Sequence, residues 1–157
     1  MHVAVDAANQ VIVSARLSQC AADVGELVPT IEAATRHAGR KPKSVLADSG
    51  YRSEKNFRTL KRKNIEGFVS LGREGKQKAL DASDKRETKR MEARLATKRG
   101  RRIYARRKTL VEPVFGWIKG VIRFRSFSLR GVRKVAAEWS LVCLAMNLRR
   151  MAGLMRA

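Results

Sequence analysis

The first half of the chain alternates short apolar runs with a helical pattern of apolar residues. Residues 3–5 and 11–13 are β-rich runs separated by a polar stretch, and this arrangement predicts a β-hairpin. Through residues 24–37 apolar side chains recur at every third or fourth position, which predicts an amphipathic helix. Gly39 follows this pattern and is the expected stop signal. A hairpin followed by one helix is therefore expected in this part of the chain.

A second unit of strand, helix and strand follows. Residues 44–47 form a short, largely apolar run that is typical of a buried parallel strand. Ser53 is a suitable N-cap for a helix that runs through residue 60, and residues 67–71 form another β-rich run. This alternation predicts a layered α/β fold whose strands share one sheet. The strands are expected near residues 2–6, 11–17, 44–48 and 66–71.

The second half of the chain carries helical patterns and many basic residues. Residues 72–103 contain few large apolar side chains, which predicts a basic insertion or loop with a frayed helix over residues 83–97. In residues 111–122 the apolar side chains fall on one helix face. A last helix over residues 131–151 is apolar around much of its circumference, so it is expected to pack onto the sheet.

The charge of the chain indicates a class of partner. The 157 residues include 35 Lys and Arg against 14 Asp and Glu, which gives a formal net charge of +21. A domain with this charge repels itself unless a polyanion neutralises it. Nucleic acid is therefore the first candidate partner and an anionic membrane surface the second. Bound DNA offers an alternative interpretation of residues 72–103, as a basic arm that becomes ordered on binding.

The sequence also predicts where the protein resides. It contains no run of about 18 uncharged apolar residues, so no membrane span is expected. Its first residues lack the pattern of a signal peptide. Cys20 and Cys143 lie far apart and are expected to be reduced, buried thiols. These features predict a cytoplasmic protein.

Two acidic residues stand at positions where chemistry is expected. Asp48 ends the predicted buried strand, where open α/β sheets place ligands and catalytic groups, although it is equally suited to form a turn. Glu112 precedes Pro113 and is therefore expected near a helix start, where a carboxylate also favours the positive end of the helix dipole. Gly116 and Lys119 share the helix face of Glu112. Residues 88–157 hold nineteen basic side chains but only three acids, Glu92, Glu112 and Glu138.

Taken together, these segments resemble a known family. The runs ADSGY at residues 47–51 and VEPVFGWIK at residues 111–119 resemble bacterial insertion-sequence transposases of the DDE class, and the similarity extends through residues 130–148. This resemblance implies a ribonuclease H-like fold, a mixed sheet flanked by helices. It also implies metal-dependent cleavage and transfer of DNA strands, with Mg²⁺ or Mn²⁺ held by carboxylates. The implied partner is double-stranded DNA, at the element ends and at the target.

The resemblance assigns roles to individual residues. Asp48 matches the second Asp of the catalytic triad and Glu112 matches the Glu, so both are implied metal ligands. Lys119 matches the lysine of the family's Tyr–Arg–Glu–Lys signature. Tyr104 resembles its tyrosine but lies eight residues before Glu112 instead of seven, so the arginine is either Arg107 or is replaced by Lys108. The residues expected to contact DNA are Tyr104, Arg106, Arg107, Lys108, Trp117 and Lys119.

Aromatic residues in the same segment have two interpretations. Trp117 is a candidate to stack on a flipped base. Phe115, by contrast, follows the apolar helical spacing and is expected in the core.

The first Asp of the triad has no match. In similar transposases it lies on a first strand, upstream of the strand that residues 3–6 represent, and Asp6 is expected to serve the hairpin instead. We therefore expect residues 1–157 to be a DDE catalytic domain truncated at its N-terminus, without the first strand and inactive in strand transfer. The alternative is a non-catalytic basic DNA-binding domain, and charge alone would also permit a ribosome-associated protein. A homodimer within a DNA complex and association with the bacterial nucleoid are further expectations.

Overall fold

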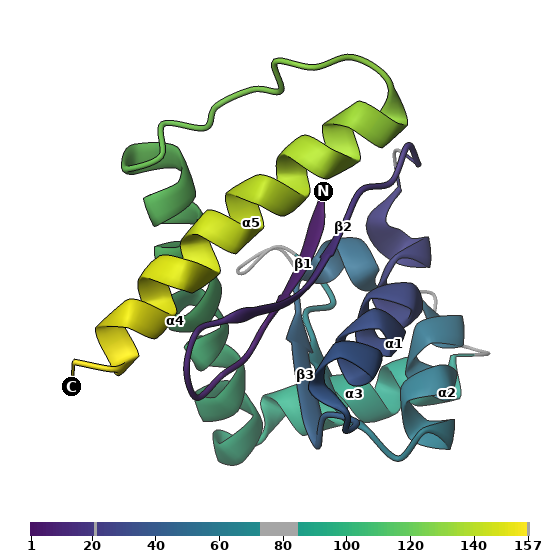
Figure 1. Ribbon diagram of the computed structural model, residues 1–157. Helices are drawn as coiled ribbons and strands as arrows, with labels where there is room; N and C mark the ends of the chain where they lie inside the picture. The colour runs from purple at the N-terminus through teal and green to yellow at the C-terminus, as the bar shows by residue number, and fades with distance from the viewer. Residues whose placement is uncertain (21, 73–84, 157) are drawn as a thin grey trace.

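The computed structural model describes residues 1–20, 22–72 and 85–156 and shows a mixed α/β domain (Figure 1). The chain forms β1 (His2–Val5), β2 (Ile12–Arg16), α1 (Leu27–Ala38), β3 (Ser44–Ala47), α2 (Glu54–Arg62), β4 (Glu66–Val69), α3 (Arg86–Ala96), α4 (Lys98–Gly120) and α5 (Val132–Leu154). Single 3₁₀ turns, η1 (Asp23–Gly25) and η2 (Ser49–Tyr51), precede α1 and α2. The predicted strands and helices of the first half are thus present, with boundaries shifted by a few residues.

The strands form two separate sheets, so the prediction of one shared sheet is wrong. β1 and β2 make an antiparallel hairpin, whereas β3 and β4 pair in parallel. Within the residues that the structure describes, no strand pairs with the second edge of β1 or with that of β3. Periodicity predicts that a segment is a strand, but pairing also requires two edges within hydrogen-bonding distance. The side chains of His2 and Tyr51 link the start of β1 to the turn after β3, at 2.8 Å between Nδ1 and the hydroxyl.

Asp6 has the structural role that the sequence predicts. Its Oδ2 accepts the N–H groups of Ala8 and Asn9 at 3.1 and 2.8 Å, and its own N–H donates to the carbonyl of Val11 at 2.8 Å. Gln10 completes the turn with a φ of 55°. One oxygen of this carboxylate is therefore occupied by the hairpin itself.

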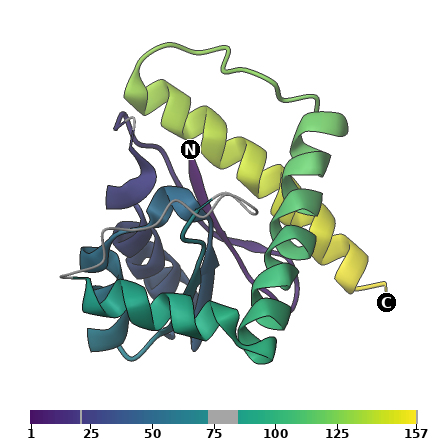
Figure 2. The same cartoon turned by 180° about the vertical axis from the view of Figure 1, so that it is seen from behind.

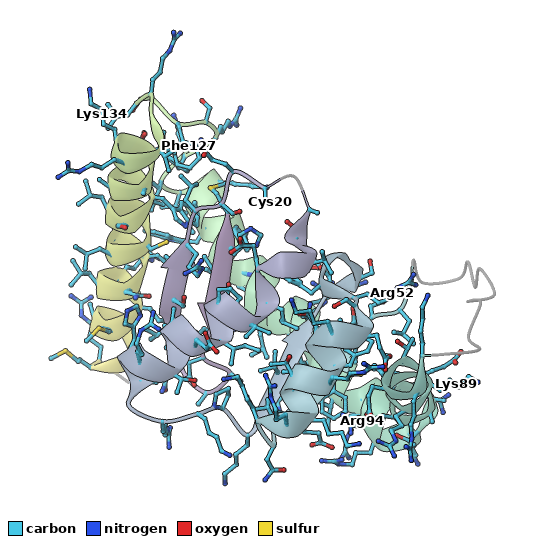
Figure 3. All side chains as sticks on the ribbon, turned by 90° about the vertical axis from the view of Figure 1, so that its right-hand side faces the viewer. Cys20, Arg52, Lys89, Arg94, Phe127 and Lys134 are labelled. Atoms are coloured by element: carbon cyan, nitrogen blue, oxygen red, sulfur yellow. The ribbon has the colours of Figure 1, made fainter. Side chains whose placement is uncertain are left out.

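Two hydrophobic clusters hold the helices against the sheets. One joins α1, α2 and α3 to the β3–β4 sheet, and the other joins α4 and α5 to the hairpin. Figure 2 shows α3 and α4 from behind, and Figure 3 shows α5 at one edge of the molecule. The first cluster contains Leu27, Ile31, Ala47, Phe57, Leu60, Ile65, Val69 and Met91. The second contains Ile12, Val114, Ile118, Trp139, Val142, Cys143 and Met146.

The last helix packs onto the sheet as predicted. Asn147 of α5 pairs with the backbone of Ile12 on β2, accepting its N–H and donating to its carbonyl, both at 2.8 Å. Cys143 is buried in the same contact region, but Cys20 is exposed, which corrects the prediction of two buried thiols. None of the described helices is long and apolar enough to cross a membrane.

The basic segment 72–103 is largely helical from residue 86 onward. Residues 86–96 form α3, within the helix predicted over residues 83–97, and residues 98–103 begin α4 where a loop was expected, while residues 73–84 lie outside the described residues. Hydrogen bonds and an ion pair to other elements stabilise these two helices, and the local sequence pattern does not reveal them. Glu54 of α2 accepts the N–H groups of Glu87 and Thr88 at the start of α3, at 3.0 and 2.9 Å. Arg99 makes a bidentate ion pair with Glu66 at 2.7 and 2.9 Å.

Gly100 is expected to tolerate no side chain, because it packs directly against the backbone at the junction between α3 and α4. A Cβ there would lie 1.9 Å from the carbonyl oxygen of Arg94, a backbone atom that cannot move aside. Gly100→Ala should therefore lower the free energy of unfolding by about 3 kcal/mol. Gly116→Ala in the same helix is the matched control, since no atom lies within 4 Å of its Cβ position. The control should gain up to about 1 kcal/mol. Urea denaturation measures both, and equal effects would contradict the packing argument.

Candidate functional site

Asp48 occupies the carboxyl end of β3, where the sequence places it. It follows the buried residue Ala47, is exposed, and its Oδ1 accepts the N–H of Gly50 at 3.0 Å. This hydrogen bond is the turn-forming role considered from the sequence. Because it uses only Oδ1, it orients the carboxylate without excluding a second interaction at the other oxygen.

The structure brings a second carboxylate, that of Asp23, to the same turn. A Cβ built on Gly50 would lie 3.0 Å from Oδ2 of Asp23 and 3.2 Å from Oδ1 of Asp48. The two carboxylates therefore both lie close to the position that a Cβ on residue 50 would occupy, and glycine leaves this position empty. Sequence reasoning missed Asp23 because it belongs to no recognised motif and directly precedes the pattern of the first helix. Its partnership with Asp48 depends on the contact between η1 and η2, which is formed by the fold.

His2 and Tyr51 lie next to this carboxylate pair. His2 is 3% exposed, and its Nε2 lies 3.9 Å from Oδ1 of Asp23. Burial raises the pKa of Tyr51 to about 12, with further contributions from the negative charges of Asp23, Asp48 and Glu26. The Tyr51 hydroxyl therefore keeps its proton at neutral pH. The hydrogen bond between the two side chains ties η2, which follows Asp48, to the start of β1.

Glu112 lies in the middle of α4, so the prediction of a nearby helix start is wrong. Pro113 has no N–H to donate to the carbonyl of Thr109, which would ordinarily interrupt the helix. Here Nε2 of Gln10, from the hairpin, donates to that carbonyl at 3.0 Å. The helix therefore continues through Pro113 because a distant side chain satisfies the carbonyl that proline leaves unpaired.

The predicted common face of Glu112, Gly116 and Lys119 is confirmed. All three residues are exposed, whereas Val114 and Ile118 on the other side of α4 are buried. The helix carrying Glu112 also packs against β3 and β4, the sheet that ends at Asp48. That Asp48 and Glu112 bind one metal site together stays a prediction.

Basic residues surround Glu112 along the same helix. Arg101 and Lys108 are exposed and lie on the face of Glu112, eleven and four residues before it. Arg106 is also exposed. Arg107 is half-buried, with its guanidinium 5.8 Å from the ring centroid of Tyr104. The structure thus pairs Tyr104 with Arg107, three residues further along the helix.

Trp117 is half-buried and lies against α5. The guanidinium of Arg149 covers its ring at 5.0 Å from the centroid, and its indole N–H is buried without a hydrogen-bond partner. It lines an open pocket of about 460 Å³ together with Pro113, Met146 and Arg149. Because one face of the ring is covered, stacking on a base would require the other face or a movement of Arg149. Phe115 packs against the core beside α5, as the sequence predicts.

The other two acids of residues 88–157 are placed differently. Glu138 accepts hydrogen bonds from the N–H and hydroxyl of Ser128 and from the N–H of Leu129, at 2.6 to 3.2 Å. These bonds hold the pKa of Glu138 below its usual range, with the Ser128 hydroxyl contributing most. Through these hydrogen bonds Glu138 anchors the segment between α4 and α5. Glu92 is exposed on α3.

The carboxylates meet part of what a divalent metal requires. In residues 1–20, 22–72 and 85–156, no group of three or more His, Cys, Asp and Glu side chains is placed to hold a metal ion. Mg²⁺, however, is commonly bound by one or two carboxylates together with water and substrate phosphates. Asp48 and Asp23 provide two such hard oxygen donors beside one open point. Oxygens of this kind bind Mg²⁺ or Mn²⁺ when water and a phosphate complete the coordination.

These features define a basic α/β domain with exposed carboxylates at the end of a strand and on a positively charged helix. The chain belongs to the transposase DDE domain family, whose model matches residues 1–148. No curated protein and no solved structure matches the chain. Membership confirms the family predicted from the sequence. It makes DNA the implied partner, and members of this family generally use a divalent metal.

Proposed function

We propose that this domain is part of a transposase that cleaves and joins DNA strands in the transposition of an insertion sequence, and that residues 1–157 alone are inactive in strand transfer. The observation that carries the proposal is the exposed face of α4, where Glu112 is the sole acid of the helix and lies between Arg101, Lys108 and Lys119. A carboxylate among these cations repels the DNA phosphates and so lowers the affinity for DNA. A metal ion bound between the carboxylate and a DNA phosphate would turn this repulsion into attraction, which accounts for a negative charge on a basic face.

The proposed chemistry is an in-line displacement at a phosphodiester. Asp48 and Glu112 would hold the divalent metal, with Asp23 as a further oxygen donor beside Asp48. A bound Mg²⁺ or Mn²⁺ would supply the positive charge that activates the attacking oxygen and stabilises the leaving oxygen. The chain itself positions the substrate: the exposed basic residues of α4 bind backbone phosphates, which fixes the DNA without reading its sequence. The Gly50 N–H orients the carboxylate of Asp48 before the metal or DNA binds.

We also propose that residues 1–157 form one DDE domain with a ribonuclease H-like sheet. The His2–Tyr51 hydrogen bond, which ties the start of β1 to the turn after β3, supports a single domain that contains both sheets. No cluster of three metal-ligating side chains is found among the described residues. Residues 1–157 alone should therefore bind Mn²⁺ weakly and fail to catalyse strand transfer.

A second candidate is a non-catalytic DNA-binding domain. It is favoured by the lack of a three-carboxylate cluster among the described residues. A domain of this kind requires only the basic surface, so its affinity for DNA should not depend on a metal held by Asp48 or Glu112. The two candidates therefore differ in what the carboxylates do.

Titration with Mn²⁺ in the presence of a short DNA duplex tests the proposal. Asp48→Asn and Glu112→Gln should each weaken Mn²⁺ binding by about tenfold or more, because each removes a proposed ligand. The free Mn²⁺ signal in electron paramagnetic resonance measures this binding. Glu92→Gln is the matched control, since it removes an exposed acid of α3 and the same charge. Equal losses in all three variants, or Mn²⁺ binding unaffected by any of them, would overturn the site and leave the non-catalytic alternative.

A further inference from the structure

The segment between α4 and α5 is neither helix nor strand, yet one side of it packs against the core. It comprises residues 121–131 and leads from the end of α4 to the start of α5 (Figure 1). Its half-buried side chains Ile122, Phe124 and Phe127 pack against the second hydrophobic cluster. The ring centroid of Phe124 lies 5.2 Å from that of Phe127 and 6.0 Å from that of Trp139. This packing fixes which side of the segment faces solvent.

The solvent side of this segment presents cations. Two arginines alternate with the packed residues, and three further cations follow before and within the first turn of α5. Residues 121–137 contain no acid, and none of the ion pairs between described residues involves these five cations. We call residues 121–134 the basic ridge. Its exposed cations are Arg123, Arg125, Arg130, Arg133 and Lys134.

The backbone of the basic ridge is held at two points. The carboxylate of Glu138, in the second turn of α5, accepts the N–H of Ser128 at 2.9 and 3.2 Å and its hydroxyl at 2.6 Å. It also accepts the N–H of Leu129 at 3.1 Å. Nearer α4, the N–H of Phe124 donates to the carbonyl of Ile118 at 3.1 Å. A single carboxylate thus accounts for three of the groups that fix the second half of the ridge.

Arg123 has an uncommon backbone conformation. Its φ of 56° lies in the left-handed region, which a residue with a side chain adopts at a cost in free energy. Such a conformation persists where the surrounding contacts hold it, and it is frequent at binding sites. The contacts of the neighbouring Phe124, through its N–H and its ring, hold it here. The held conformation of an exposed arginine supports a binding role for the ridge.

We propose that Glu138 is a positioning residue for DNA binding, which holds the basic ridge in the form that contacts the backbone phosphates of a duplex. The proposal rests on the proposed function only for the identity of the partner, DNA, and not for the metal site. Five cations without a neighbouring acid supply the charge complementarity. A segment that is ordered before binding loses less conformational entropy when its cations meet the phosphates.

Glu138→Ala and Glu138→Gln test this role, because charge alone and positioning predict opposite results. Each variant removes one negative charge from a basic surface, which by itself should strengthen binding to duplex DNA. Positioning predicts weaker binding, by about tenfold for Glu138→Ala and by less for Glu138→Gln, which keeps one acceptor oxygen. Fluorescence anisotropy at about 0.1 M salt measures the dissociation constant. Glu92→Ala, the control, removes an exposed acid of α3 and should leave that constant unchanged or slightly lower.

Ser128→Ala tests the same role without a change in charge. It removes the hydroxyl that donates to Glu138 at 2.6 Å, so the duplex affinity should fall about threefold. Ser126→Ala is the matched control, since Ser126 is an exposed serine two residues earlier and is not among the partners of Glu138. Its affinity should equal that of the wild-type chain. This pair keeps the proposal testable if Glu138→Ala does not fold.

Limited digestion with trypsin measures the basic ridge itself, in the absence of DNA. Cleavage after Arg125 and Arg130 should be about tenfold faster in Glu138→Ala than in the wild-type chain, because the segment opens more often. Cleavage after Arg36, which is exposed on α1, should not change. An equal rise at all three sites would show general loss of structure, which circular dichroism also detects, and would overturn a local role of Glu138.

Duplex binding by Glu138→Ala that equals or exceeds that of the wild-type chain, or equal affinities of the two serine variants, would overturn the proposal. So would Glu138-dependent binding to phosphatidylserine vesicles without Glu138-dependent binding to the duplex. If Mn²⁺ binding does not depend on Asp48 and Glu112 but Glu138→Ala still weakens duplex binding, the proposed function fails and the positioning role stands. A wild-type chain that binds no duplex would overturn both.

Discussion

Raising the salt concentration from about 50 to about 200 mM is expected to weaken duplex DNA binding by about a hundredfold or more. The reason is the net charge of +21, most of it on exposed side chains of α4, of the following segment and of the start of α5. Each phosphate contact releases condensed counterions, and four contacts suffice for an effect of this size over a fourfold change in salt. These exposed residues include Arg101, Arg102, Arg106, Lys119, Arg123, Arg125, Arg130, Arg133 and Lys134.

Fluorescence anisotropy with two labelled duplexes of unrelated sequence measures this dependence. Both duplexes should bind with similar affinity and the same salt slope, because phosphate contacts carry no sequence information. Salt-independent binding would contradict an electrostatic surface. A strong preference for one of the two duplexes would instead indicate base contacts that the basic face does not account for.

Removing three cations from α4 is expected to reduce DNA affinity by about a hundredfold at about 0.1 M salt and the salt slope by about 3 units. The variant is Arg101→Gln/Arg106→Gln/Lys119→Gln, in which all three residues are exposed on the helix that carries Glu112. Glutamine keeps the helix propensity of these positions close to that of lysine and arginine. The loss should therefore come from phosphate contacts and not from unfolding.

The matched control removes the same charge from another part of the molecule. Arg36, Arg40 and Lys43 are exposed near the end of α1 and before β3, in the nearly neutral first part of the chain. Their replacement by glutamine should change the affinity only slightly. If both triple variants lose affinity equally, DNA responds to net charge alone, and the assignment of α4 as the DNA-binding face is wrong.

The local elements of this protein follow from short stretches of its sequence. The hairpin is predicted because two β-rich runs flank a short polar stretch, and the structure shows that the carboxylate of Asp6 accepts N–H groups within three residues of it. The start of α2 is predicted because Ser53 caps the N–H of Asn56, again three residues away. Such interactions need no other part of the fold, so a sequence pattern is sufficient to identify them.

The position of Glu112 shows where local reasoning fails. Proline is favoured at the first helical turn, and from the sequence alone Pro113 indicates a helix start. The structure continues the helix because Gln10, 99 residues away from Thr109 in sequence, donates to the carbonyl of Thr109. The residues near Pro113 in the sequence therefore do not reveal that the helix continues.

The sequence by itself determined the helical and strand segments, the family motifs and the basic character of the second half. The tertiary structure alone decided that the strands pair as two sheets, that Asp23 lies beside Asp48, and that part of the apolar circumference of α5 is exposed. The physical reason is that local preferences arise from neighbours within one helical turn or one strand repeat. Pairing of edges, convergence of charges and coverage of apolar faces depend instead on segments distant in the chain, which only packing brings together.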